Sequence, residues 1–306
     1  MRTAFVNELV KQAGKNKNIM LLTGDLGYTV FEEFIKKFPN QFLNAGVAES
    51  NMVGVATGLA LSGKIVFCYS IASFASLKTF EQIRDDVCVH NVSVIIIGSG
   101  SGLSYSDAGP THHNIEDIAL MRTLPNIQIF APADALEVSW CVEQAIKNKK
   151  PTYIRLGKRG EPLIYKKTPK LKYGKGKVLR KGKDYAVIST GNLVYNSLEA
   201  SEILSKKGIN GTVVSLHTLK PVDKNLISSL CRKYKFIITV EEHSIYAGLG
   251  GIVSEISAEK GYGNKIKIIG IKDNFTFVSG SHEYLRKKYG LTPVRIAGTI
   301  KKFVKQ

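Results

Sequence analysis

Residues 64–98, KIVFCYSIASFASLKTFEQIRDDVCVHNVSVIIIG, carry the clearest structural pattern in the chain. Two short apolar runs within them, 64–69 and 92–98, have the length and the composition of buried strands. The residues between, 74–89, place Phe74 and Phe80 at helical spacing and predict a helix. A strand, a helix and a second strand in this order predict two parallel strands with the helix on one face of the sheet.

The same alternation extends through the first half of the chain. Further buried strands are predicted at 18–23, 127–131 and 152–156, and further helices at 3–14, 47–61 and 133–147. This pattern predicts a first domain, residues 1–165, built as a mainly parallel sheet with helices on both faces.

A second alternation predicts a second domain of the same class at 184–306. Its strands are expected at 185–190, 212–216, 236–241 and 266–271, and its helices at 193–207, 223–233, 248–259 and 292–304. Between the domains, 166–183 holds nine Lys or Arg residues, no acid, and several Gly and Pro residues, so it is predicted to be a basic linker. The expected fold class is α/β with two domains.

Composition excludes several classes of protein. Of the 306 residues, 44% are hydrophobic and 22% charged, which is ordinary for a globular chain and excludes a disordered or collagen-like one. No apolar run approaches the length of a membrane span, and the N-terminus has no apolar segment of the kind found in signal peptides. The four cysteines form no metal-binding pattern. We expect a cytoplasmic protein with no metal site of its own.

The net charge of +18 raises the question of nucleic-acid binding. Half of this charge lies in the basic linker, and no nucleic-acid-binding motif is present. Attraction for phosphorylated small molecules or for an acidic partner chain explains the charge better. We therefore expect no nucleic acid and no membrane among the partners.

One acidic residue, Glu49, stands within the small and apolar stretch 44–60, NAGVAESNMVGVATGLA. A carboxyl at the start of a helix is usually a cap or a partner of the helix dipole. The alternative is a buried carboxyl that stays protonated and donates to a ligand nitrogen. The residues alone leave both interpretations open.

Two histidines, His112 and His113, follow the buried strand 92–98 in the segment 102–117, GLSYSDAGPTHHNIED. Ligands of open α/β sheets bind beyond the carboxyl ends of the strands, so these histidines are candidate site residues. Phe74, which follows another strand, is by default a core residue, but an aromatic ring at this place can also lie against a flat ligand ring.

Six segments carry a resemblance to a known family: GVAESNMVGVATGLA, YSIASFASLKTFEQIR, AGPTHHNIEDIALMRTLPN, IFAPADALE, LKPVD and VEEHSIYAGLGG. In this order and spacing they resemble the C-terminal half of thiamine-diphosphate-dependent transketolases. The chain is most similar to the separate C-terminal subunit of split transketolases, and more distantly to the last two domains of deoxyxylulose-phosphate synthase. The resemblance implies a pyrimidine-binding domain at 1–165 and a transketolase C-terminal domain at 184–306.

The resemblance also implies roles for the candidate residues. Glu49 falls on the acid that hydrogen-bonds the aminopyrimidine ring of thiamine diphosphate and starts its activation. Phe74 falls on the aromatic residue that stacks on this ring, and His112 on the histidine that lines the substrate channel near the reacting carbon. His113 is the neighbouring candidate.

Four further residues fall on or near positions that bind the substrate phosphate. These are Arg2, its weaker companion Thr29, and Arg159, or Lys158 if the alignment shifts by one residue. The forked donors of an arginine suit it to a phosphate.

One motif of full-length transketolases is missing. The segment at 24–27 reads GDLG rather than GDG, and no set of carboxylate and amide residues replaces the Mg²⁺ and diphosphate site. The resemblance therefore implies that an N-terminal subunit supplies this half of the site, in an α2β2 hetero-oligomer with homodimeric contacts and with the cofactor at the interface. The chain alone is expected to be inert.

Two positions depart from the family pattern. Where similar enzymes carry a His and an Asp that touch sugar hydroxyls, this chain has Gly100 and Ala108. We expect the vacated space to admit a bulkier or less hydroxylated acceptor, unless Asp107 compensates. The ordinary pentose-phosphate substrates are therefore in question.

The implied activity belongs to carbohydrate metabolism: transfer of a two-carbon ketol unit from a ketose phosphate to an aldose or modified sugar, through a carbanion of thiamine diphosphate. One alternative is the decarboxylating condensation of pyruvate, as in deoxyxylulose-phosphate synthase. Another is a non-catalytic regulatory partner of a complete transketolase, although the presence of Glu49, Phe74 and His112 argues against it.

Overall fold

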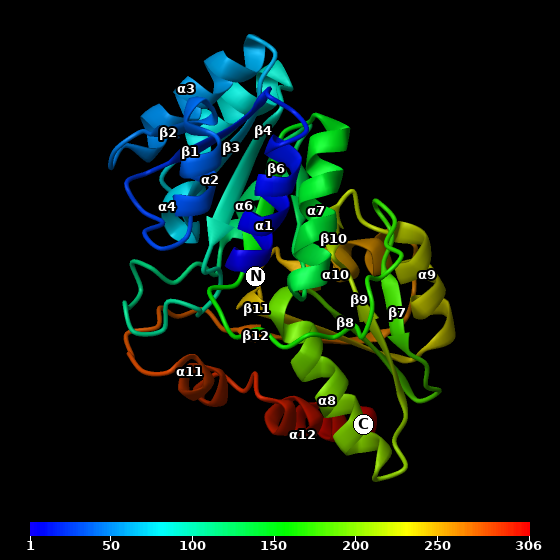
Figure 1. The fold of residues 1–306 in the computed structure, drawn as a ribbon. Helices are drawn as coiled ribbons and strands as arrows, with labels where there is room; N and C mark the ends of the chain where they lie inside the picture. The colour runs from blue at the N-terminus through cyan, green and yellow to red at the C-terminus, as the bar shows by residue number, and fades with distance from the viewer.

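The computed structural model describes residues 1–306, and its twelve strands form two sheets (Figure 1). The first sheet has the order β10-β5-β6-β4-β3-β1-β2 and the second β12-β11-β8-β9-β7. All pairs of neighbouring strands are parallel except β10 with β5 and β7 with β9, both at sheet edges. The predicted α/β fold class with two mainly parallel sheets is confirmed.

The strands are β1 Ile19–Thr23, β2 Phe42–Asn44, β3 Ile65–Ile71, β4 Val94–Ser99, β5 Gln128–Phe130, β6 Thr152–Leu156, β7 Lys177–Arg180, β8 Tyr185–Ser189, β9 Gly211–Ser215, β10 Thr218–Lys220, β11 Phe236–Ser244 and β12 Lys265–Ile271. The helices are α1 Arg2–Ala13, α2 Glu32–Lys37, α3 Glu49–Leu61, α4 Ala72–Ser76, α5 Phe80–Gln82, α6 Asp117–Thr123, α7 Ala135–Asn148, α8 Val194–Ser205, α9 Lys224–Lys233, α10 Leu249–Glu259, α11 His282–Lys288 and α12 Pro293–Val304. Short 3-10 segments are η1 Pro39–Gln41 and η3 Gly191–Leu193, and η2 Ile83–Cys88 is a π-helix.

Helices cover both faces of each sheet because each helix carries one apolar stripe. In the first domain, α1 and α7 pack together on one face through residues such as Phe5, Leu9 and Val142. The opposite face is covered by α3, η2 and α6. In the second domain, α8 and α12 lie on one face and α9 and α10 on the other. None of the helices is both long and apolar enough to cross a membrane.

The two domains share secondary structure and core. Strand β10 follows β9 in the chain, yet it pairs with β5 and so extends the first sheet. A core cluster of 33 buried residues runs from the α3 face of the first sheet to the α9 and α10 face of the second. Within the predicted linker 166–183, residues 177–180 form β7, an edge strand of the second sheet. The exact domain boundaries stay a prediction.

The predicted helix 74–89 is interrupted once: α4 ends at Ser76, and α5 begins at Phe80 and continues directly into η2. Two hydroxyls in this region bond back to carbonyls four residues earlier: Ser76 Oγ donates to the Ala72 carbonyl (2.6 Å) and Thr79 Oγ1 to the Ala75 carbonyl (2.7 Å). Such bonds compete with regular helix geometry and bend the chain. The break ends α4 shortly after β3 and keeps Phe74 at the edge of the sheet.

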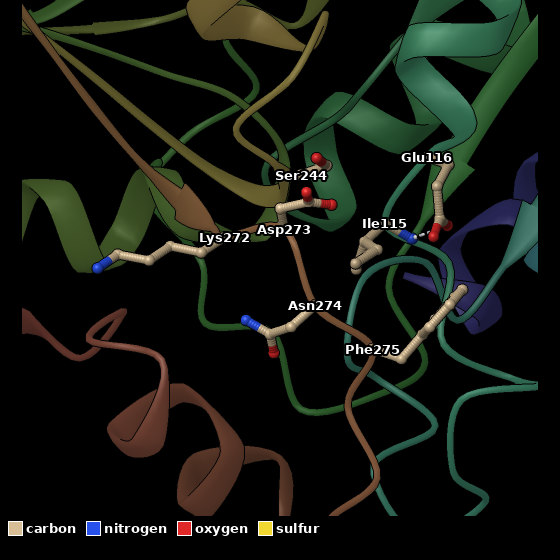
Figure 2. Close-up of a pocket in the computed structure, with 7 residues that line it drawn as sticks. All are labelled: Ile115, Glu116, Ser244, Lys272, Asp273, Asn274 and Phe275. Carbon is tan, nitrogen blue, oxygen red and sulfur yellow. Dashed lines mark hydrogen bonds between the residues drawn. The ribbon is translucent and has the colours of Figure 1, made fainter.

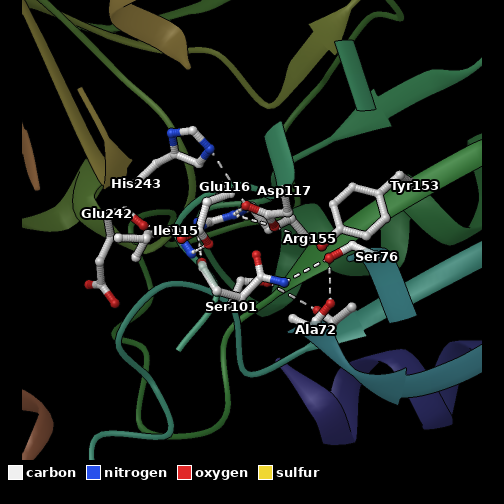
Figure 3. A network of polar contacts seen from close by, with 12 residues as sticks. Ala72, Ser76, Ser101, Ile115, Glu116, Asp117, Tyr153, Arg155, Glu242 and His243 are labelled. Atoms are coloured by element: carbon white, nitrogen blue, oxygen red, sulfur yellow. Dashed lines mark hydrogen bonds and ion pairs between the residues drawn. The ribbon is translucent and has the colours of Figure 1, made fainter. Parts of the chain in front are cut away.

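A buried network of charges joins the domains (Figure 3). Arg155 of β6 donates from Nε to Asp117 of α6 (2.9 Å), and Tyr153 donates its hydroxyl to the same carboxylate (2.7 Å). A further guanidinium nitrogen of Arg155 donates to the backbone carbonyl of Glu242 in β11 (2.8 Å). Because Arg155 and Asp117 are both almost completely shielded from solvent, each needs the other as its counter-charge.

We expect Asp117→Asn to lower the free energy of unfolding by about 3 kcal/mol, because it leaves the Arg155 charge buried without a partner. The matched control is Asp85→Asn, which removes one charge from the exposed pair of Arg84 and Asp85 and is expected to cost under about 0.5 kcal/mol. Urea unfolding of both variants checks this. Equal midpoints for the two variants would contradict the structural role given to the network.

Candidate active site

Side chains from several elements meet at the carboxyl edge of the first sheet. Glu49 opens α3 beyond β2, and Phe74 lies in α4 immediately after β3. His112 lies in the loop after β4, and Lys158 follows the end of β6. Parallel strands end at the same edge, so segments far apart in the sequence are brought to one place, where ligands of open α/β sheets bind.

Glu49 is only 2% exposed and occupies the first turn of α3. Its carboxylate Oε2 lies 2.6 Å from the ammonium of Lys78, a side chain that is itself 51% exposed. Gly24 of the GDLG segment lies against the carboxyl: a Cβ there would be 3.5 Å from Glu49 Cγ. The first-turn position agrees with the helix-dipole interpretation, whereas the burial agrees with a carboxyl that serves a ligand. A ligand that bonds to Glu49 has to displace Lys78 or share the carboxyl with it.

Three aromatic rings form a continuous line from Phe74. The ring of Phe74 lies 5.2 Å from that of His112, edge to face, and the ring of Tyr105 lies 6.0 Å from His112. Ser73 fixes the His112 loop by donating its hydroxyl to the Thr111 carbonyl (3.1 Å). The structure thus brings Phe74 and His112 into direct contact, and adds Tyr105.

His113 lies away from this line of rings, inside the protein. It is 5% exposed, and neither of its ring nitrogens has a hydrogen-bond partner. Burial lowers its pKa, which keeps the imidazole neutral. Neighbouring residues in the sequence therefore have different surroundings: His112 is half-buried beside Phe74, whereas His113 faces the domain interface.

Asp107, Lys158 and Arg159 line a polar pocket between the domains with a volume of about 290 Å³. Its walls come from three segments and are polar or glycine throughout: Ser104, Ser106, Asp107, Lys158, Arg159, Gly280, Ser281 and His282. Lys158 lies 3.7 Å from the Asp107 carboxylate. Nε2 of His282 lies 2.7 Å from the buried carboxylate of Glu242.

Arg2 and Thr29 line a different cavity, of about 430 Å³. Arg2 connects the two cavities, because its Nε donates to the backbone carbonyl of Lys158 (2.8 Å). Thr29 is exposed, with a left-handed φ of 61°. The structure therefore places Arg2 beside Lys158, and does not place Thr29 in the pocket of Lys158 and Arg159.

The expectation of vacant space at Gly100 is wrong. Gly100 has a φ of 76°, and a Cβ built on it would lie 2.1 Å from Cε2 of Tyr105. The Tyr105 ring therefore occupies the space beside Gly100, and glycine is required there both by backbone conformation and by the ring. Ala108 is exposed, and the expectation of open space at that position stays a prediction.

Three residues of this region were missed by sequence reasoning. Tyr105, Lys78 and His282 each contact a predicted site residue or line its pocket. In the sequence, only Gly100 hinted at a role for Tyr105. A glycine has no side chain, so an aromatic ring can pack directly against its backbone. Lys78 and His282 gave no signal, because their partners are brought near only by the fold.

A further pocket of about 290 Å³ lies where the segment after His113 meets the second domain (Figure 2). It is lined by Ile115, Glu116, Ser244, Lys272, Asp273, Asn274 and Phe275. The side chain of Lys272 points away from the others (Figure 2). None of the predicted site residues lines this pocket.

The chain contains no group of three or more His, Cys, Asp or Glu side chains arranged to hold a metal ion. At the carboxyl edge of the first sheet, the groups around the candidate site are the Glu49 carboxyl with its partner Lys78, the His112 imidazole and two aromatic rings. This set suits a flat heterocycle with hydrogen-bonding nitrogens.

Two family models match the chain. Residues 1–161 match the transketolase pyrimidine-binding domain, and residues 174–296 match the transketolase C-terminal domain.

Relatives cover the chain at nearly full length. It is 36% identical over all of its length, and 97% of the relative's, to a protein of Phocaeicola vulgatus that is named as one subunit of apulose-4-phosphate transketolase. The protein of the same name from Actinobacillus succinogenes is 38% identical over 84% of this chain and 83% of its own length. A 1-deoxy-D-xylulose-5-phosphate synthase of Halothermothrix orenii is 35% identical over 89% of this chain but only 43% of its own length.

A solved structure has the same fold over the whole chain. It is a split-gene transketolase, described as an inactive β4 tetramer, with a TM-score of 0.89 and 36% identity over 99% of this chain and 97% of its own. The two matching domains, in this order and over this length, show that the chain belongs to the transketolase family, as a C-terminal section that contains the pyrimidine-binding domain and the C-terminal domain.

Proposed function

We propose that this chain is the C-terminal subunit of a split transketolase that transfers a two-carbon ketol unit from a ketose phosphate to an aldose or modified sugar. The observation that carries this proposal is the half-site at the carboxyl edge of the first sheet. There a buried carboxyl, Glu49, and the contacting rings of Phe74 and His112 stand in a chain that has no metal-binding cluster.

The residues present fit the aminopyrimidine end of thiamine diphosphate. In this proposal the buried Glu49 carboxyl hydrogen-bonds a ring nitrogen, and the ring of Phe74, which contacts His112, stacks on the aminopyrimidine. When bound, thiamine diphosphate supplies the nucleophilic carbon that carries the two-carbon unit. His112, half-buried next to Phe74, is assigned in this proposal to hydrogen-bond the reacting end of the sugar, and its contact with Phe74 supports this role.

The cations near this site suit the phosphate of the sugar. Lys158 and Arg159 line the polar pocket between the domains, and Arg2 hydrogen-bonds the backbone of Lys158. Arg and Lys side chains bind phosphate oxygens through charge-assisted hydrogen bonds. Thr29 lines the neighbouring cavity together with Arg2. Any role of Thr29 in phosphate binding is therefore proposed only within that cavity.

The other half of the site is proposed to come from a separate N-terminal subunit. Mg²⁺ and a diphosphate need several oxygen ligands and hydrogen-bond donors, and this chain has no group of three or more His, Cys, Asp or Glu side chains that could hold a metal ion. The relatives support this proposal in two ways. Two of them are named as one subunit of a transketolase. The solved split-gene transketolase, a β4 tetramer, is described as inactive. An α2β2 assembly places one cofactor in each interface.

The exposed residue Ala108 supports a prediction about the sugar acceptor. We expect the assembled enzyme to use ribose 5-phosphate poorly, and Ala108→Asp to improve kcat/KM for it by roughly 5- to 10-fold, the worth of one added hydrogen bond to a sugar hydroxyl. Ala108→Asn is the matched control, with the same shape and no charge. Ordinary transketolase efficiency of the unaltered complex with ribose 5-phosphate would show instead that neighbours such as Asp107 supply the contact.

A substrate panel tests the proposed reaction. The chain, co-purified with its N-terminal subunit, is given xylulose 5-phosphate or pyruvate together with an aldehyde acceptor. Ketol transfer predicts cleavage of xylulose 5-phosphate without release of carbon dioxide. Carbon dioxide from pyruvate would favour the synthase-type condensation. Co-purification with a complete transketolase whose rate the chain leaves unchanged would favour a regulatory partner.

A further inference from the structure

Tyr105 contacts two residues of the proposed substrate site, His112 and Lys158. Its ring lies over Gly100, where any side chain would collide with it. It lies near the ring of His112 (6.0 Å between ring centroids), and the ammonium of Lys158 lies 4.1 Å from its ring centroid. A sugar phosphate whose carbonyl is near His112 and whose phosphate is near Lys158 must pass along Tyr105.

The Tyr105 hydroxyl is free to bind a ligand. No other group of the chain hydrogen-bonds it, and it is not among the polar atoms that are buried without a partner, so it remains open to solvent. Burial of the ring raises the pKa of Tyr105, and the charge of Arg2 opposes this only in part. The phenol therefore stays protonated at neutral pH and can donate a hydrogen bond.

The surroundings hold the ring in one position. A cation over the ring face and a tilted contact with the His112 imidazole both favour a defined orientation. Lys158 is itself held by the Asp107 carboxylate (3.7 Å), and the loop closes through a hydrogen bond from the Ala108 amide to the Tyr105 carbonyl (3.1 Å). A pre-positioned hydroxyl loses little entropy when a substrate binds, which makes it an effective specificity contact.

We propose that Tyr105 determines which sugars this enzyme accepts: its ring limits the width of the channel between His112 and Lys158, and its hydroxyl donates to a sugar hydroxyl beyond the second carbon. This inference rests on the proposed ketol transfer. The space expected to be vacant beside Gly100 is filled by the Tyr105 ring. In the proposal, this ring narrows the channel and its hydroxyl hydrogen-bonds the sugar.

The test uses Tyr105→Phe, which removes only the hydroxyl, in the complex with the N-terminal subunit. With xylulose 5-phosphate as the donor, we expect KM for ribose 5-phosphate to rise about 5- to 10-fold, the worth of one hydrogen bond. Glycolaldehyde, an acceptor with only two carbons, cannot reach Tyr105, and its kcat/KM is expected to stay unchanged at a saturating donor concentration. Tyr246→Phe, which removes an exposed phenol in the second domain, is the control and is expected to change neither value.

A second variant, Gly100→Ala, keeps the hydroxyl but displaces the ring, and is expected to show the same selective loss with ribose 5-phosphate. Equal effects of Tyr105→Phe on both acceptors, or no effect on either, in an active complex would overturn the inference and leave the proposed function intact. An unaltered complex that transfers no ketol unit from xylulose 5-phosphate to any aldose of a panel that includes both acceptors would overturn the proposed function, and this inference with it.

Discussion

Glu49→Gln in the assembled enzyme is expected to lower turnover by about 10²- to 10⁴-fold, the usual loss when an essential acid–base group is removed. Glutamine has nearly the shape of glutamate but cannot exchange a proton with the cofactor ring. Since the variant retains the buried position at the start of α3, the fold and the assembly of the complex are expected to survive. Steady-state turnover together with circular dichroism and gel filtration separates the two effects.

The chain offers a close control for this variant. Glu8 is also a buried glutamate paired with a half-exposed lysine, Lys11, at 3.1 Å, but it lies on α1 away from the site. Glu8→Gln is expected to change turnover by less than about 2-fold, as for a substitution remote from the site. If Glu49→Gln assembles and keeps near-full turnover as Glu8→Gln does, Glu49 is a partner of the helix dipole and of Lys78, and the proposed acid role is wrong.

The isolated chain is expected to show no saturable binding of thiamine diphosphate. The cofactor carries most of its charge on the diphosphate, whose Mg²⁺ requires about six oxygen ligands in a strict geometry. This chain presents the Glu49 and Phe74 end of the site and no group of three or more metal-binding acidic, His or Cys side chains. Isothermal titration with thiamine diphosphate and Mg²⁺ is expected to give only dilution heat for the chain alone, and a saturable isotherm for the complex with the N-terminal subunit.

Tight, Mg²⁺-dependent binding by the chain alone would contradict the split-site proposal. It would require oxygen ligands that this structure does not bring together. Weak binding that is independent of Mg²⁺ would be compatible with the aminopyrimidine half-site, because Glu49 and Phe74 contact only that ring in the proposal. Titration with and without Mg²⁺ therefore distinguishes the two cases.

Most strands were predictable because each parallel strand is buried on both faces and appears as an apolar run. The runs at 64–69, 92–98 and 152–156 correspond to β3, β4 and β6. Three edge strands, β2, β7 and β10, were not predicted from local pattern. Each is short, only one neighbour defines it, and β10 pairs with a strand of the other domain.

The candidate site was predictable where a motif or a strand end marks it, as for Glu49 and His112. It was not predictable where the surroundings of a residue depend on segments that lie far away in the sequence. Adjacent histidines have opposite surroundings, because the loop turns His113 into the domain interface. The role of Gly100 could not be inferred from its missing side chain alone: what fills the space is a ring five residues later, and only the fold shows it.

Ketol transfer by this chain and by its N-terminal subunit, each alone and in mixtures, is the decisive measurement for a split enzyme. With xylulose 5-phosphate, thiamine diphosphate, Mg²⁺ and an aldose panel, we expect no turnover by either chain alone. Activity should rise as this chain is added to the N-terminal subunit and reach a plateau at equimolar amounts. Turnover by this chain alone, or an active N-terminal subunit whose rate does not change on its addition, would show that the two chains do not share one active site.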